Sequence, residues 1–272
     1  MRYIEVYIQN IRADLKEILI AFLPDFGFNQ MEESETEIKA YAPEGDSDLE
    51  DLKQWLNEHQ VIFQVSMMEE TNWNASWESN FQPVEIPGKI LVRADFHPKQ
   101  TGYEHEIVIT PKMSFGTGHH ATTKMMMEAM LEVDFSNKTV FDFGTGTGIL
   151  AILAEKLGAA EVMAIDHDIW SYENAMENLI KNSAQNIRVF CKDQLTGIGT
   201  FDIVLANINK NVLLEQADAI RTILNKNGVL ILSGLLSSDY EDICLKYVPL
   251  FGNKIKQYQQ GEWIAISFNL RP

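Results

Sequence analysis

The segment DFGTGTG at residues 142–148 combines residue types suited to binding a small molecule. Its acid, Asp142, falls within a β-branched and aromatic stretch that predicts a short buried strand over residues 139–143. Three glycines then alternate with other residues, and the apolar spacing after Gly148 predicts a helix. A strand that turns into a helix brings free backbone N–H groups and the positive end of the helix dipole to one point, and glycine lets a ligand approach closely. The segment therefore predicts a ligand-binding turn.

The glycine spacing distinguishes between two classes of ligand. Dinucleotide-binding turns carry G-x-G-x-x-G, whereas residues 144–148 read G-x-G-x-G with an acid two positions earlier. This pattern resembles the first motif of S-adenosylmethionine-dependent methyltransferases, in which the acid serves the charged methionine end of the cofactor. A glycine-rich turn that binds no ligand stays the alternative for this motif taken alone.

Two further acids follow predicted strands. Asp166 stands at the carboxyl end of a strand expected over residues 161–165, where a carboxylate can accept hydrogen bonds from both ribose hydroxyls of a nucleoside. Nicotinamide enzymes use an acid in the same way, so Asp166 indicates adenosine without separating the two families. Asp193 lies just past residues 187–190, where it could reach an adenine edge or be an ordinary loop acid.

The polar residues at the strand ends are expected to gather at one edge of a sheet. Asn207 ends the strand predicted over residues 201–206. In open parallel sheets the ligand lies at the carboxyl ends of the strands. We therefore expect Asp142, Gly144, Asp166 and Asn207 to lie near the same ligand.

A second glycine loop, MSFGTGHHATT at residues 113–123, precedes a helix with methionines on one side. Its adjacent histidines, His119 and His120, raise the possibility of a metal site. No H-x-x-x-H spacing or carboxylate partner supports that idea, so we predict no metal.

The elements that must position these residues make an α/β domain over residues 89–272. Seven strands are expected in its sheet, with helices between the first five and an antiparallel hairpin at the end. A turn is expected at Asn227-Gly228, between a helix and the fifth strand. This mostly parallel, Rossmann-like sheet is the architecture expected of a class I methyltransferase.

Residues 71–88 are expected to link this domain to the preceding one. Trp73, Trp77 and Phe81 are four residues apart, which predicts an aromatic stripe on a short helix, with a turn at residues 86–88. Packing against a neighbouring domain is the favoured role of this stripe, and direct contact with substrate is the alternative.

Residues 1–70 predict a small α+β domain of ferredoxin-like order, strand-helix-strand-strand-helix-strand. The segment holds 16 acidic and 5 basic residues, a net charge of −11 out of −17 for the chain. An acidic surface can steer a basic partner, so we interpret the domain as a substrate-recognition module, although a merely solvated surface has the same composition.

Bulk composition limits the function classes. The chain has 272 residues, 46% of them hydrophobic, without a run of 18 apolar residues or a signal-peptide pattern, so no membrane association is expected. Two cysteines, Cys191 and Cys244, make neither a disulfide framework nor a zinc site, which favours the cytoplasm. The negative charge argues against direct nucleic-acid binding.

Taken together, these features resemble the bacterial PrmA family, the methyltransferases of ribosomal protein L11. The resemblance spans nearly the whole chain and rests on the acidic amino-terminal module, the WxxxW linker, the FGTG…HxTT loop, DFGTGTGILAI, Asp166 and LANI at residues 205–208. It implies S-adenosylmethionine as cofactor, with contacts at Thr123, Gly144, Asp166 and Asn207. The chain departs from the family's usual GTGTHPTT loop, because His119 and Ala121 replace Thr and Pro.

The family resemblance implies methyl transfer to lysine ε-amino groups, the N-terminal α-amino group, or both, of the basic ribosomal protein L11, by a cytoplasmic monomer. A lysine amine has a pKa of about 10.4, so its deprotonation near pH 7 costs about 4–5 kcal/mol. A nearby sulfonium and partial desolvation both lower that pKa. No residue is an obvious strong base. Our hypothesis is that Asn207 and adjacent backbone carbonyls hold the neutral amine in line with the methyl group.

Three other functions compete with this one. A methyltransferase acting on another protein, on glutamine or on nucleic acid is the first; such enzymes commonly carry N-P-P-Y where residues 207–210 read N-I-N-K. A nicotinamide oxidoreductase is disfavoured by the glycine spacing. A binding module without catalysis is disfavoured because Gly144, Asp166 and Asn207 are all present.

Overall fold

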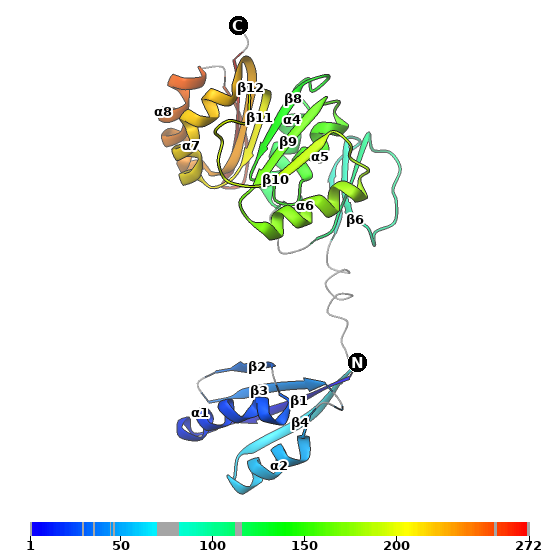
Figure 1. Cartoon of the computed structure of the whole chain (residues 1–272), viewed down its shortest axis with the longest axis vertical. Coiled ribbons are helices and arrows are strands. Elements are labelled where there is room, and N and C mark those ends of the chain that lie inside the picture. Colours follow the sequence, from blue (N-terminus) through cyan, green and yellow to red (C-terminus); the bar gives the residue numbers. More distant parts are fainter. Residues whose placement is uncertain are drawn as a thin grey trace. The chain divides into compact units, whose positions relative to one another are not determined.

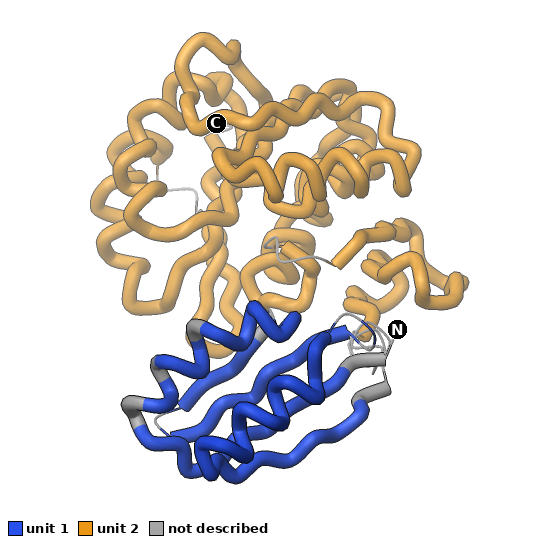
Figure 2. Tube along the Cα trace, turned by 60° about the horizontal axis from the view of Figure 1, so that its bottom comes forward, with its two compact units in different colours: residues 1–81 blue, residues 82–272 orange. Residues whose placement is uncertain are grey.

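A computed structural model describes residues 2–28, 30–34, 36–43, 45, 47–69, 82–111, 116–252 and 255–270. The chain divides into two compact units, Met1–Phe81 and Gln82–Pro272 (Figures 1 and 2). Trp73, Trp77 and Phe81 lie outside the described residues, so the predicted linker helix stays a prediction.

Unit 1 is a four-stranded antiparallel sheet with two helices. In chain order its elements are β1 (Arg2–Gln9), α1 (Ala13–Phe22), η1 (Leu23–Phe26), β2 (Gln30–Glu33), β3 (Ile38–Pro43), α2 (Leu49–Glu58) and β4 (Ile62–Glu69). The strand order β2-β3-β1-β4 confirms the ferredoxin-like arrangement. Alternate residues Ile4, Val6 and Ile8 of β1 are buried with Leu19 of α1 and Leu52 of α2, so the period-2 pattern forms the core.

Unit 2 contains the predicted seven-stranded sheet. Its strands are β8 (Thr139–Phe143), β9 (Glu161–Asp166), β10 (Ile187–Cys191), β11 (Phe201–Asn207), β12 (Leu224–Leu236), β13 (Ile255–Gln260) and β14 (Trp263–Asn269). They follow the order β10-β9-β8-β11-β12-β14-β13, with the first five parallel and the β13–β14 hairpin antiparallel. This confirms the α/β class I methyltransferase architecture.

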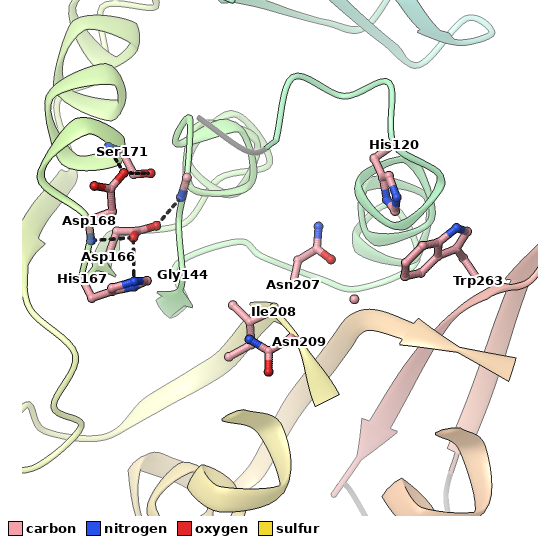
Figure 3. A pocket seen from close by; sticks show the side chains of 12 residues that line it. His120, Gly144, Asp166, His167, Asp168, Ser171, Asn207, Ile208, Asn209 and Trp263 are labelled. Carbon is pink, nitrogen blue, oxygen red and sulfur yellow. Dashed lines mark hydrogen bonds and ion pairs between the residues drawn. The ribbon is translucent and has the colours of Figure 1, made fainter. Parts of the chain in front are cut away.

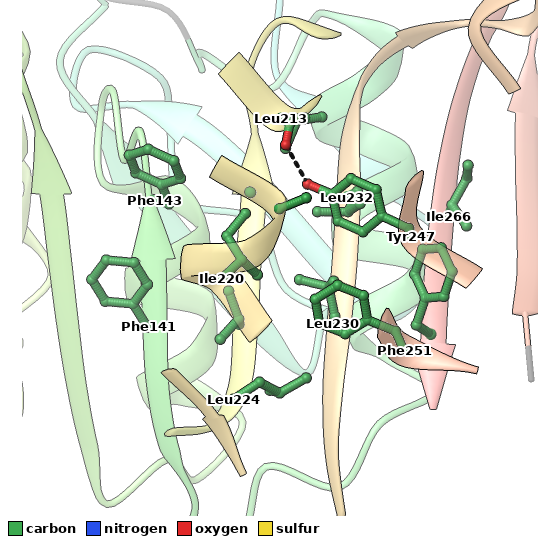
Figure 4. Packing of buried hydrophobic residues seen from close by; sticks show 14 of the residues in the cluster. Phe141, Phe143, Leu213, Ile220, Leu224, Leu230, Leu232, Tyr247, Phe251 and Ile266 are labelled. Carbon is green, nitrogen blue, oxygen red and sulfur yellow. Dashed lines mark hydrogen bonds between the residues drawn. The ribbon is translucent and has the colours of Figure 1, made fainter. Parts of the chain in front are cut away.

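Helices cover both faces of this sheet. They are α4 (Ala121–Met130), α5 (Ile149–Lys156), α6 (Ile169–Lys181), α7 (Lys210–Ile223) and α8 (Tyr240–Phe251). A short 3-10 helix, η2 (Ser237–Asp239), directly precedes α8. On one face, Phe141 and Phe143 of β8 belong to an apolar cluster that extends to Leu213 and Ile220 of α7 and to Tyr247 of α8 (Figure 4). Burial on both faces explains why β8 and β11 are nearly continuous apolar runs.

The predicted turn at Asn227-Gly228 is wrong, because both residues lie inside the single strand β12. Leu224 pairs with Phe201 and Val229 with Ile203, so the register shifts and the residues between them bulge. A Cβ at Gly228 would lie 2.9 Å from the Asp202 carbonyl oxygen, so glycine is required by close packing and not by a reversal of the chain.

A smaller sheet adjoins helix α6. It contains β5 (Val84–Ile86), β6 (Ile90–Ala94) and β7 (His105–Ile109), and β5 falls within the range expected for the linker. Side-chain amides of α6 extend the edge of β7: Asn182 bonds both backbone groups of Val108, and Asn178 Oδ1 accepts from Thr110 N at 2.7 Å. Asn178 Nδ2 also donates to the Thr147 carbonyl at 2.8 Å, which ties α6 to the glycine turn.

Replacing Tyr247 by Phe tests the packing of α8 on α7. The buried Tyr247 hydroxyl donates to the Leu213 carbonyl at 2.7 Å (Figure 4). Loss of this bond should lower the free energy of unfolding by about 1–2 kcal/mol in urea denaturation. Tyr258→Phe, which removes a solvent-exposed bond to Glu132, is the control and should change it by less than about 0.5 kcal/mol. Equal effects of the two substitutions would contradict a structural role for the buried hydroxyl.

Candidate active site

The glycine turn links β8 to α5 through three left-handed glycines. Gly144, Gly146 and Gly148 have φ angles of 72°, 55° and 80°, a region that side chains with a Cβ rarely adopt. The backbone N–H groups of Gly144 and Thr145 both donate to the Ile165 carbonyl, at 2.9 and 3.0 Å. The turn is therefore held against the end of β9, and the N-terminus of α5 begins at Gly148.

Asp142 lies beneath this turn and is fully buried. Its Oδ2 accepts from the Thr145 hydroxyl at 2.6 Å, whereas its buried Oδ1 has no hydrogen-bond partner among the described residues. Burial is the main reason that the pKa of Asp142 is raised to about 7; the Thr145 hydroxyl opposes the rise and the neighbouring Asp166 carboxyl adds to it. The site thus contains a carboxyl group poised between its two protonation states near neutral pH.

Asp166 ends β9 and is 8% exposed. Its Oδ2 accepts from Gly146 N at 2.9 Å and its Oδ1 from Asp168 N at 3.1 Å, so backbone N–H groups fix the carboxylate. Asp168 in turn caps α6, because its carboxylate accepts from the backbone N–H groups of Trp170 and Ser171. The strand end and the following helix start therefore hold Asp166 in one orientation.

Helix α4 lies against the end of β11. Asn207 Nδ2 donates to the hydroxyl of the buried Thr123 at 3.3 Å, and Asn207 Oδ1 is buried without a partner among the described residues. His120 caps α4, and its ring meets the Trp263 ring edge-on at 4.6 Å between centroids. His119 instead contacts the Gln82 carbonyl at 2.7 Å.

These elements surround a cavity of about 480 Å³ (Figure 3). The residues that line it come from the glycine turn, the end of β9, the starts of α4 and α6, the end of β11, β12 and β14: His120, Gly144, Gly146, Asp166, His167, Asp168, Ser171, Asn207, Ile208, Asn209, Gly234 and Trp263. Figure 3 shows Asp166 and Asp168 at one end and the rings of His120 and Trp263 at the other, with Asn207 between them. The cavity can therefore hold an elongated ligand with a hydroxyl-bearing end near the carboxylates, a middle part near the Asn207 amide and a second end near two aromatic rings.

The structure brings three of the four predicted contact residues to this cavity: Gly144, Asp166 and Asn207. Thr123 lies behind Asn207 and orients its amide. The exposed Asp193 is not among the lining residues, which leaves a role at an adenine edge without support.

Sequence reasoning missed Trp263, Gly234 and Ile208, and it considered His120 only as a metal ligand. Trp263 and Gly234 belong to strands far along the chain, and no local pattern marks them as site residues. Ile208 directly follows Asn207 in the chain, and this position next to a predicted contact residue is the one signal that could have indicated it as a site residue.

Within the described part of the chain, no group of three or more His, Cys, Asp or Glu residues could hold a metal ion. None of its described helices is long and apolar enough to cross a membrane.

Comparison with known families gives one match over nearly the whole chain. The model of the family described as ribosomal protein L11 methyltransferase (PrmA) matches residues 9–271. A ribosomal protein L11 methyltransferase of Porphyromonas gingivalis is 39% identical over 93% of this chain and 90% of its own length. That of Chlorobaculum tepidum is 37% identical over 94% and 92%, respectively.

Solved structures show the same fold. A ribosomal protein L11 methylase from Lactobacillus delbrueckii subsp. bulgaricus superposes with a TM-score of 0.63 at 27% identity, over 71% of this chain and all of that one. A Thermus thermophilus 16S rRNA N2 G1207 methyltransferase, solved with AdoMet and guanosine, superposes with a TM-score of 0.51 at 20% identity, over 58% of this chain and 45% of that one. The second likeness concerns the fold alone.

Replacing Asp142 by Asn tests the buried carboxyl group. Because the folded-state pKa of about 7 exceeds the ordinary value of 3.8, the folded protein binds more protons than the unfolded chain between these values. The contribution of Asp142 to wild-type stability should therefore fall as pH rises toward 7, by about 1.4 kcal/mol per pH unit, and level off above it.

The unfolding free energy of Asp142→Asn minus that of the wild type should accordingly increase by about 2 kcal/mol between about pH 5.5 and about pH 8.5. Urea denaturation at a series of pH values measures it, and other titrating groups cancel in the difference. A difference independent of pH would show that Asp142 is ionised in the folded protein throughout this range.

Proposed function

The chain belongs to the ribosomal protein L11 methyltransferase family, and from this premise we propose that it transfers methyl groups from S-adenosylmethionine to amino groups of ribosomal protein L11. The acceptors are lysine ε-amino groups, the N-terminal α-amino group, or both. The observation that carries this proposal is Asn207 Oδ1 beside the cavity, which is buried, has no partner among the described residues and is held in place through Thr123.

The residues around the cavity fit the cofactor. When bound, S-adenosylmethionine supplies a methyl group made electrophilic by a positively charged sulfur. Asp166 presents a fixed carboxylate suited to the two ribose hydroxyls, as the family resemblance implies. Gly144 lines the cavity with backbone atoms, and Asp142 in its ionised form contributes negative potential from beneath the turn toward the charged methionine end.

Asn207 is suited to hold a neutral amine. Thr123 takes the amide N–H of Asn207, so Oδ1 is left to accept a hydrogen bond from an incoming amine. A neutral amine can donate that bond and still direct its lone pair at the methyl group. Backbone carbonyls next to Asn207 can accept its second N–H. On this view catalysis comes mainly from positioning, with the amine proton released to water.

Unit 1 is suited to recognise a basic protein. The net charge of −11 over residues 1–70 favours association with a basic partner, and the partner that the family name specifies is ribosomal protein L11. The proposal includes a cytoplasmic, monomeric enzyme that makes no direct contact with nucleic acid. Its alternative is methylation of another protein or of nucleic acid, and mass spectrometry of L11 and ribosomal RNA after the reaction distinguishes between them.

Replacing Asn207 by Ala tests the amine-positioning role. Without the Asn207 carbonyl oxygen, kcat should fall by about a hundredfold, since small misplacements of reacting groups have effects of this size. Binding of S-adenosylhomocysteine, measured by calorimetry, should weaken much less. Asn225→Ala is the matched control, because that amide pairs with Asp202 at the opposite end of the sheet. An Asn207→Ala enzyme with unchanged kcat and cofactor affinity would refute the role.

Deleting residues 1–70 tests the recognition role of unit 1. The shortened chain should bind the cofactor as the full chain does and should methylate a short lysine peptide, but transfer to intact L11 should be lost, because the acidic docking surface is gone. Steady-state rates on both substrates measure the difference. Undiminished activity on intact L11 would remove the docking role.

A further inference from the structure

Ile208 is packed between two glycines that belong to different parts of unit 2. A Cβ at Gly144 would lie 2.3 Å from Ile208 Cγ2, and a Cβ at Gly234 would lie 2.2 Å from the Ile208 carbonyl oxygen. Both distances are shorter than any van der Waals contact. The side chain of Ile208 therefore lies directly on the glycine turn after β8, and its backbone lies directly on β12.

The backbone on either side of Ile208 is anchored. Asn207 ends β11, where it pairs with Ser233 and bonds Thr123. Asn209 caps α7, because its Oδ1 accepts from Val212 N at 3.1 Å. Ile208 thus joins two fixed residues and its carbonyl lies against Gly234, so its main chain is held beside the turn, and β-branching limits the rotation of its side chain.

Ile208 also differs chemically from the other cavity residues. Of the described residues that line the cavity, Ile208 alone has an aliphatic side chain. It lies between Gly144 and Asn207, with the rings of His120 and Trp263 beyond Asn207 (Figure 3). A cavity residue that touches the cofactor turn and directly follows the amine-positioning Asn207 borders the space between them, through which the alkyl group passes.

We propose that Ile208 is the specificity-determining residue that limits the size of the transferred group, admitting methyl and excluding larger alkyl groups. This inference rests on the proposed function. In the reaction the amine nitrogen forms a bond to the alkyl carbon, the carbon–sulfur bond breaks with its electron pair left on a neutral thioether, and one amine proton goes to water. Shortening Ile208 enlarges the space for the alkyl carbon chain and leaves Asn207 and Asp166 in place.

The first test compares methyl with allyl transfer. For Ile208→Ala, the ratio of kcat/KM with the S-allyl analogue to kcat/KM with S-adenosylmethionine should rise at least tenfold over wild type, because one or two methylenes in a pocket change selectivity by about 10–200-fold. Ile208→Val, which keeps Cγ2, should give a smaller rise. Ile180→Ala, at a side chain that is 78% exposed on α6, is the control and should leave the ratio unchanged.

The second test uses the glycines and does not depend on turnover. Gly144→Ala should lower Tm and weaken S-adenosylhomocysteine binding because its Cβ meets Ile208 Cγ2. Ile208→Ala removes that atom and leaves Ile208 Cβ at 3.8 Å, an ordinary contact, so the double variant should regain part of both losses. Gly234→Ala meets backbone atoms of Ile208, so the same second substitution should not rescue it.

The outcomes separate this inference from the proposed function. If the wild type methylates no amine of L11 with S-adenosylmethionine, the proposed function fails. If the wild type methylates L11 but neither Ile208→Val nor Ile208→Ala changes the allyl-to-methyl ratio, the size limit is overturned and the function stands. Rescue of Gly144→Ala and Gly234→Ala to the same extent by Ile208→Ala would contradict the packing on which the inference depends.

Discussion

The burial of two carboxyl groups near the carboxyl ends of adjacent strands is the constraint on which the site depends. Asp142 is the last residue but one of β8 and Asp166 ends β9, and each bonds a different part of the same glycine turn, through the Thr145 hydroxyl and the Gly146 N–H. Buried like charges destabilise one another, which raises the pKa of Asp142 beyond the effect of its burial. A cationic ligand placed above the turn would relieve this repulsion. The repulsion between the two carboxyl groups lowers the stability of the folded protein, and the same negative potential favours binding of a positively charged cofactor.

Rigid surroundings keep these groups in place. The apolar cluster of Phe141, Tyr247 and their neighbours fills the face of the sheet covered by α7 and α8 (Figure 4). On α6, Asn178 bonds both the Thr147 carbonyl and the backbone of Thr110, so turn, helix and small sheet form one hydrogen-bonded assembly. Loops that carry the site are thus held at both ends by packed elements, which suits a reaction that depends on positioning.

Local patterns explain why much of this could be predicted from the sequence. Alternating glycines after a strand, an acid at the next strand end and the ferredoxin-like order all depend on neighbours in the chain, and the structure contains each of them. Trp263 could not be found in this way, because it reaches His120 only after the β13–β14 hairpin joins the sheet. The turn predicted at Asn227-Gly228 failed for the same reason: pairing with β11 absorbs the extra residues as a bulge.

The separation of charge within the cavity favours positioning over acid–base chemistry. A carboxylate next to the acceptor amine would stabilise its ammonium form, raise its pKa and oppose attack on the methyl group. Asp166 and Asp168 lie at one end of the cavity and the rings of His120 and Trp263 at the other, and the uncharged amide of Asn207 lies between them beside the aliphatic side chain of Ile208 (Figure 3). Partial desolvation there lowers the pKa of a lysine amine, and the positive sulfonium lowers it further. The neutral amine is then favoured by its surroundings, and a hydrogen bond to Asn207 Oδ1 orients it without a strong base.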